Sequence, residues 1–64
     1  MYSQIIKNLR KESGLSLGEL SRNSGIPKAT IANWERGYEP SAAKLDAVLN
    51  ALGFELIIQR KENP

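Results

Sequence analysis

Apolar residues recur at intervals of three and four along most of this chain, which is the spacing of helices with one buried face. The clearest stripe consists of Leu45, Val48, Leu49 and Leu52. Shorter stripes of the same kind precede it. The pattern predicts four helices, over about residues 3–12, 17–23, 27–36 and 41–52.

Residues that start and stop helices lie between these stripes. Ser16 is followed three residues later by Glu19, the spacing of a capping box in which each side chain binds the other residue's backbone N–H. Gly25 permits a positive φ, and Pro27 suits the first turn of a following helix. We therefore expect the second and third helices to be short and to be joined by a tight turn.

The spacing changes after Gly53. Phe54, Leu56 and Ile58 alternate with Glu55, Ile57 and Gln59, which predicts a β-strand over about residues 54–60. A single strand needs a hydrogen-bonding partner, and the pattern indicates no second strand. We expect the strand to pair with its copy in a homodimer, through Phe54, Leu56, Ile57 and Ile58. The alternative is an extended tail that only closes the core.

Composition narrows the classes of function. The 64 residues, which allow one domain over 1–64, include nine Lys/Arg, seven Asp/Glu, no Cys and no His. Without Cys and His, most metal sites and nucleophile–base pairs cannot be built, so we expect no metal, no cofactor and no enzymatic activity. No apolar run approaches the roughly 20 residues of a membrane span, and residues 1–10 lack the apolar core of a signal peptide. We expect a cytoplasmic protein.

Two short helices joined by a turn containing glycine have the geometry of a DNA-reading helix-turn-helix. Several spaced segments resemble the lambda-repressor/Cro-like (Xre) family in order: Gly14 to Ser21, Ser24 to Ile31, Trp34 to Gly37, and Pro40-Ser41. The resemblance covers roughly residues 3–53. It implies an all-α, compact four-helix DNA-binding domain, to which the predicted strand would add a homodimer contact.

The resemblance also implies which residues face DNA. Base contacts are expected at Lys28, Ala29, Ala32 and Asn33. Lys28 can donate to guanine O6 and N7, and Asn33 can pair with adenine N6 and N7. Phosphate contacts, which position a domain without reading sequence, are expected at Ser16, Thr30, Arg36, Tyr38 and Lys44. The alternative is that each residue only forms part of an ordinary solvated surface.

Two further features follow from the family pattern. Arg10 and Glu35 match positions that, in some repressors of this family, form an ion pair between the first helix and the end of the third. The alternative is two independent surface charges. The family usually has Gln, which grips phosphate, where this chain has Leu17, and prefers Ala where it has Ser21. We expect Leu17 either to weaken the phosphate contact or to join the core. Trp34 is expected in the core.

A domain of this type followed at once by a strand is similar to HipB-like antitoxins, through Leu52 to Leu56. That group implies a homodimeric repressor of its own operon that binds a palindromic operator of double-stranded DNA and also a toxin protein. The alternatives are a phage-type regulator, or a protein-interaction module that binds a toxin and for which DNA binding is secondary.

Overall fold

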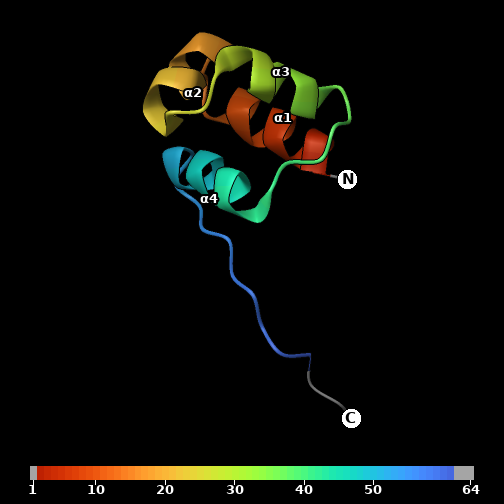
Figure 1. Ribbon diagram of the computed structural model, residues 1–64. Helices are drawn as coiled ribbons and strands as arrows, with labels where there is room; N and C mark the ends of the chain where they lie inside the picture. Colours follow the sequence, from red (N-terminus) through yellow and green to blue (C-terminus); the bar gives the residue numbers. More distant parts are fainter. Residues whose placement is uncertain (1, 62–64) are drawn as a thin grey trace.

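The computed structural model describes residues 2–61 and contains four helices. They are α1 (Tyr2–Glu12), α2 (Leu17–Ser24), α3 (Lys28–Glu35) and α4 (Ala42–Ala51) (Figure 1). The predicted all-α four-helix architecture is confirmed. The ends of α3 differ from the prediction because Pro27 and Arg36 cap the helix and do not lie within it.

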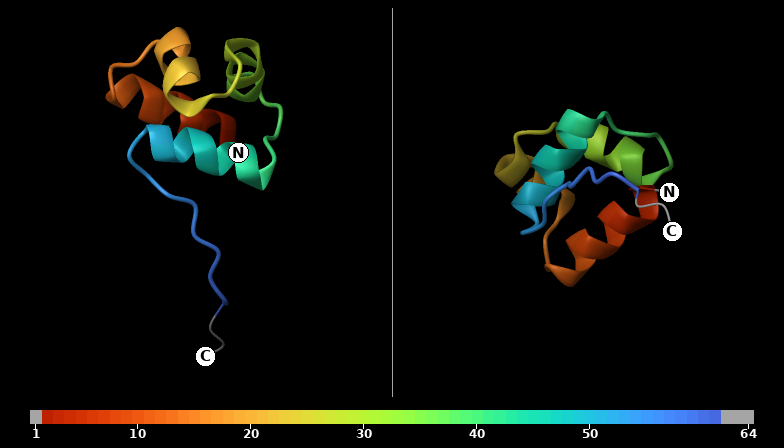
Figure 2. Two further views of the ribbon diagram at one scale, coloured as in Figure 1. Left: turned by 60° about the vertical axis from the view of Figure 1, so that its left-hand side comes forward. Right: turned by 90° about the horizontal axis from the view of Figure 1, so that it is seen from below.

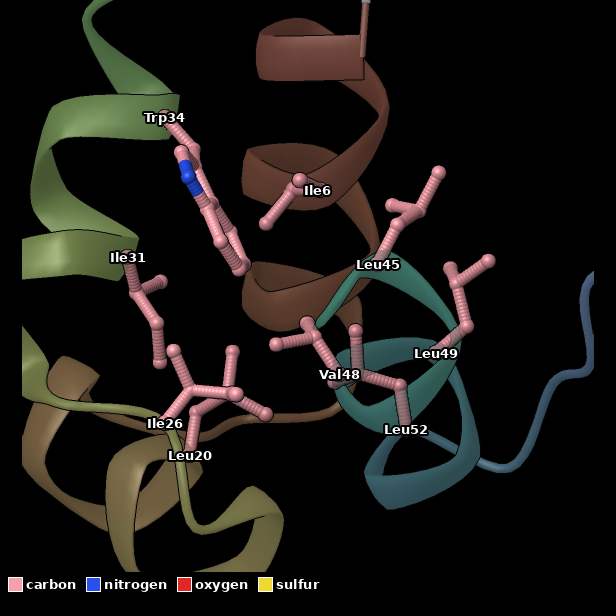
Figure 3. Packing of buried hydrophobic residues seen from close by; sticks show 9 residues of the cluster. All are labelled: Ile6, Leu20, Ile26, Ile31, Trp34, Leu45, Val48, Leu49 and Leu52. Atoms are coloured by element: carbon pink, nitrogen blue, oxygen red, sulfur yellow. The ribbon is translucent and has the colours of Figure 1, made fainter. Parts of the chain in front are cut away.

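The helices enclose one apolar core (Figure 3). Each helix contributes one side chain that solvent does not reach at all: Ile6, Leu20, Ile31 and Val48. Trp34 is only 4% exposed, as its place in the predicted core requires. Helix α3 packs against both α1 and α2, and α2 also packs against α4. The position of α3 is therefore set by packing on two neighbours.

Local hydrogen bonds end the helices as their sequences predict. Ser16 Oγ accepts from the backbone N–H of Glu19 at 3.1 Å, while Glu19 Oε1 accepts from that of Ser16 at 3.0 Å. Gly25 ends α2 with φ of 76°, and its N–H donates to the carbonyl of Ser21. These contacts lie within a few residues of sequence, which is why capping motifs can be recognised without a fold.

The predicted strand over residues 54–60 is wrong for the single chain. Residues 54–61 form no strand and extend away from the four helices (Figures 1 and 2). The physical reason is that a strand needs a ladder partner, and no other strand exists within residues 2–61. Three residues assigned to the dimer strand are largely exposed: Phe54 at 50%, Ile57 at 60% and Ile58 at 89%.

The beginning of this segment is nevertheless attached to α4. The backbone N–H of Phe54 donates to the carbonyl of Leu49 at 2.8 Å. That of Leu56 donates to Asp46 Oδ1 at 3.3 Å, and the Leu56 side chain packs against the core. Of the four residues assigned to the dimer strand, Leu56 is thus the one that packs against the core within the described chain.

Candidate nucleic-acid interface

The turn between α2 and α3 sets how these two helices meet. Gly25 adopts the left-handed conformation, and the following Ile26 places its side chain in the core at 9% exposure. Ser21 Oγ donates to the carbonyl of Ile26 at 2.7 Å, and the N–H of Ile26 donates to Ser24 Oγ at 3.2 Å. The hydrogen bond from Ser21 thus connects the turn to α2. In the sequence, Ser21 differed from the family pattern only as a replacement for the preferred Ala.

Helix α3 has one buried and one accessible side. Ile31 and Trp34 are buried, whereas the four residues expected to contact bases are exposed or half-buried: Lys28, Ala29, Ala32 and Asn33. Their spacing of one, four and five places them on one side of a helix. The structure therefore brings the four together on the solvent side of α3, where two alanines leave room for close approach.

A side-chain contact on the outer side of α3 joins two of the residues expected to bind DNA. Arg36 Nη2 donates a hydrogen bond to Asn33 Oδ1. The carbonyl of Asn33 also accepts from the backbone N–H groups of Arg36 at 3.1 Å and Tyr38 at 3.2 Å. A separation of three residues on a helix was the available signal, since such side chains are neighbours.

The residues expected to contact phosphate lie on several elements. Thr30 is half-buried on α3, and Arg36 is exposed at its end. Tyr38, 68% exposed, lies in the following loop, and Lys44 is exposed in the first turn of α4. Arg36, Tyr38 and Lys44 thus lie between the end of α3 and the start of α4. Thr30 lies in the first turn of α3, and Ser16 lies at the start of α2.

The start of α2 is occupied by its own capping box. The carboxylate of Glu19 accepts from the backbone N–H of Ser16, and this hydrogen bond is the main reason that the pKa of Glu19 is lowered. A phosphate at this helix end would meet a negative charge close by. The Ser16 hydroxyl accepts from Glu19 N–H and retains its own hydrogen to donate.

Leu17 is half-buried and packs against the core. An apolar side chain at this position therefore contributes to packing between α2 and its neighbours. Its side chain cannot donate a hydrogen bond, so it cannot bind a phosphate in the way expected of a Gln at this position.

Arg10 and Glu35 form a bidentate ion pair between α1 and the end of α3. Arg10 Nε lies 2.7 Å from Glu35 Oε2 and Nη2 lies 2.9 Å from Oε1, with the two side chains 13% and 8% exposed. Arg10 Nη1 also donates to the carbonyl of Leu15 at 3.0 Å. The pKa of Arg10 is raised above its ordinary value, chiefly by the hydrogen bond to Glu35. The pair joins α1, the α1–α2 loop and α3.

Other kinds of site find no support in the described part of the chain. Residues 2–61 contain no group of three or more acidic side chains arranged to hold a metal ion. Among the same residues, no helix is long and apolar enough to cross a membrane.

Comparison with known proteins agrees with this geometry. A family model described as "Helix-turn-helix" matches residues 6–58. The protein "HTH-type transcriptional regulator SinR" of Bacillus subtilis (strain 168) is 33% identical over 67 residues, and so is the SinR of Bacillus licheniformis. Each match covers 97% of this chain, which spans 60% of the length of either relative. No solved structure matches the chain. The chain belongs to the lambda-repressor-like (Xre) helix-turn-helix family.

Proposed function

We propose that this chain is a sequence-specific DNA-binding domain that regulates transcription by placing α3 in the major groove. The observation that carries the proposal is the two-sided character of α3. Ile31 and Trp34 anchor it in the core, while Lys28 and Asn33 lie on its accessible side beside two alanines. The family is non-enzymatic, and its SinR relatives are named as transcriptional regulators.

The proposed contacts divide into two kinds. Lys28 and Asn33 hydrogen bond to base edges, while Ala29 and Ala32 allow α3 to approach and can touch thymine methyl groups. Thr30, Arg36, Tyr38, Lys44 and Ser16 bind phosphates and so fix the register of the domain. Arg36 and Lys44 supply positive charge for this purpose, because each neutralised phosphate releases a counterion.

The regulator acts, in this proposal, as a homodimer on a palindromic operator. Residues 54–60 of two copies pair antiparallel, which supplies the ladder that one chain lacks and covers Phe54, Ile57 and Ile58. The C-terminal segment leaves the helices on the side away from α3 (Figure 1), so that pairing leaves α3 free. Two recognition helices about 34 Å apart match one turn of DNA.

The operator-bound dimer would act as a repressor, and we propose an autoregulating antitoxin role for it. This role rests on the similarity of residues 52–56 to HipB-like antitoxins and on the exposed apolar side chains of the C-terminal segment. The same side chains favour a second candidate, a protein-interaction module for which DNA binding is secondary. Salt separates the two: operator binding weakens steeply as salt rises, whereas an apolar protein contact does not.

The base-reading proposal is tested with duplexes selected from a random-sequence pool by the unmodified protein. The double variant Lys28→Ala/Asn33→Ala should lose about tenfold or more in affinity, because each base contact contributes about 1–3 kcal/mol of discrimination. Asn8→Ala/Lys11→Ala removes the same two residue types from exposed positions of α1, outside the proposed interface, and should bind normally. Equal affinity of all three proteins would refute the assignment of α3.

The dimer proposal has a separate test. Light scattering should give twice the mass of one chain for the unmodified protein, and Ile57→Pro should halve that mass because proline cannot donate to the ladder. The helical circular dichroism of Ile57→Pro should stay unchanged, since Ile57 lies outside the four helices. A monomer mass for the unmodified protein contradicts the proposal.

A further inference from the structure

The contact between Arg36 and Asn33 limits how Asn33 can present its amide to DNA. Arg36 Nη2 donates to Asn33 Oδ1 across one turn at the end of α3. The backbone carbonyl of Asn33 is held at the same time by the N–H groups of Arg36 and Tyr38. The side-chain amide and the backbone carbonyl of Asn33 are thus both hydrogen bonded to the residues that follow it.

The chemistry of the two side chains determines which amide atom faces Arg36. A guanidinium group carries hydrogen-bond donors and no acceptor, so only the amide oxygen can be its partner. The Nδ2 group, with its two N–H donors, lies on the other branch of the planar amide. The side chain is therefore oriented: Arg36 occupies one of the two lone pairs of Oδ1, and both N–H donors of Nδ2 are left to meet a base.

This orientation disfavours the usual pairing between asparagine and adenine, because Oδ1 would have to accept from adenine N6 while it also accepts from Arg36. That pairing uses the amide oxygen to accept from adenine N6 and the amide nitrogen to donate to N7. Guanine presents only acceptors in the major groove, O6 and N7, and thymine presents the acceptor O4. An asparagine that presents only its N–H donors matches these acceptor edges in full. At adenine it can bind N7 but leaves the neighbouring N6 amino group without a partner.

We propose that Arg36 is a positioning residue that makes Asn33 read a hydrogen-bond acceptor, so that guanine or thymine is selected over adenine at the base that Asn33 contacts. This inference rests on the proposed function, because it assumes that α3 enters the major groove. From its residue type alone, Asn33 is expected to prefer adenine. The orientation imposed by Arg36 changes the preferred base to guanine or thymine. Arg36 can also bind phosphate, since its guanidinium has five N–H donors and the contact to Asn33 uses one.

The test begins by locating the base pair. The unmodified protein and Asn33→Ala each select duplexes from a random-sequence pool, and the pair at which Asn33→Ala loses its preference is the one Asn33 reads. Four duplexes that differ only at this pair are then titrated with the unmodified protein, Arg36→Met and Arg22→Met. Arg22 is an exposed residue of α2 and serves as the control for the loss of one positive charge.

The unmodified protein should prefer guanine or thymine to adenine by about fivefold, the lower end of what a base contact contributes. Arg36→Met should reduce or reverse that preference, because the amide is free to turn its oxygen toward adenine N6. Arg22→Met should keep it. The proposal is overturned if adenine is preferred by the unmodified protein, or if Arg36→Met weakens all four duplexes equally. It is also overturned if Asn33→Ala changes no preference. Failure to select any sequence would overturn the proposed function itself.

Discussion

At the scale of single residues, Arg10 is where three parts of the molecule meet. Its guanidinium donates to both carboxylate oxygens of Glu35 on α3 and to the carbonyl of Leu15 in the α1–α2 loop. The side chain of Glu35 is only 8% exposed, so water replaces these hydrogen bonds poorly. A buried pair of this kind contributes little compared with apolar residues of equal size, but it is costly to break.

Replacing one partner should therefore be more harmful than neutralising both. Arg10→Met should lower the free energy of unfolding by about 3–5 kcal/mol, because it leaves the Glu35 carboxylate buried without its cation. The double variant Arg10→Met/Glu35→Gln should recover part of that loss. Urea unfolding followed by circular dichroism measures both changes. A loss below about 1 kcal/mol for Arg10→Met is what an exposed ion pair gives, and would contradict this account.

At the scale of secondary-structure elements, the start of α2 combines a capping box with a core contact. Ser16 and Glu19 satisfy each other's backbone N–H groups, and Leu17 between them packs into the core. The Glu19 carboxylate makes part of the cap depend on pH, because its pKa is lowered in the folded chain. The Leu17 contact is apolar and does not depend on pH. The two contributions can be separated experimentally.

The cap should depend on pH. The pKa of Glu19 is lowered in the folded chain because its carboxylate accepts a hydrogen bond from the Ser16 backbone. A lowered pKa means stabilisation that is present above the ordinary glutamate value and is lost as pH falls through the folded value. Glu19→Gln keeps an accepting oxygen without the charge. The unmodified protein should lose more thermal stability than Glu19→Gln between neutral pH and pH values below the ordinary glutamate pKa. Parallel losses would show that another group is responsible.

Replacing Leu17, the apolar residue after the cap, by Gln should lower stability and raise DNA affinity. Leu17→Gln introduces the residue usual in the related family and should lower the free energy of unfolding by about 1 kcal/mol, since Leu17 is half-buried. The amide supplies a donor for a phosphate, so affinity for selected duplexes should rise. Urea unfolding and DNA titration measure the two effects, with Leu17→Met as the apolar control. Unchanged affinity in Leu17→Gln would place the phosphate elsewhere.

At the scale of the whole molecule, the described chain has two unlike parts. Four helices form a body around one core, and the segment after Leu56 extends from it, so that the molecule measures 43 × 22 × 19 Å (Figures 1 and 2). Ile57 and Ile58 are exposed at 60% and 89% and contribute nothing to that core. Their burial requires another surface, which the proposed homodimer supplies.

Dimerisation should make stability depend on protein concentration. The thermal midpoint of the full chain should rise with concentration, because association stabilises the folded state by mass action. A chain that ends after Leu56 should keep its helical circular dichroism and unfold at a midpoint independent of concentration. A constant midpoint for the full chain, measured over a hundredfold range of concentration, would leave the proposed dimer without support.

Much of the fold could be predicted from the sequence because its causes are local. Apolar spacing indicates a helical face, and Ser16, Glu19 and Gly25 act through hydrogen bonds to residues a few positions away. The accessible side of α3 follows from the same periodicity. The pairing of Arg10 with Glu35 was indicated only by resemblance, since 25 positions separate the two residues.

The tertiary structure decided what depends on partners distant in sequence or on choices among several contacts. Leu17 had two interpretations, and its packing against the core supports one of them. Asn33 could be placed on a face, but its amide orientation depends on where the flexible Arg36 side chain lies. The residues after Gly53 alternate like a strand, yet they form none here, because a strand exists only where another backbone completes its hydrogen bonds.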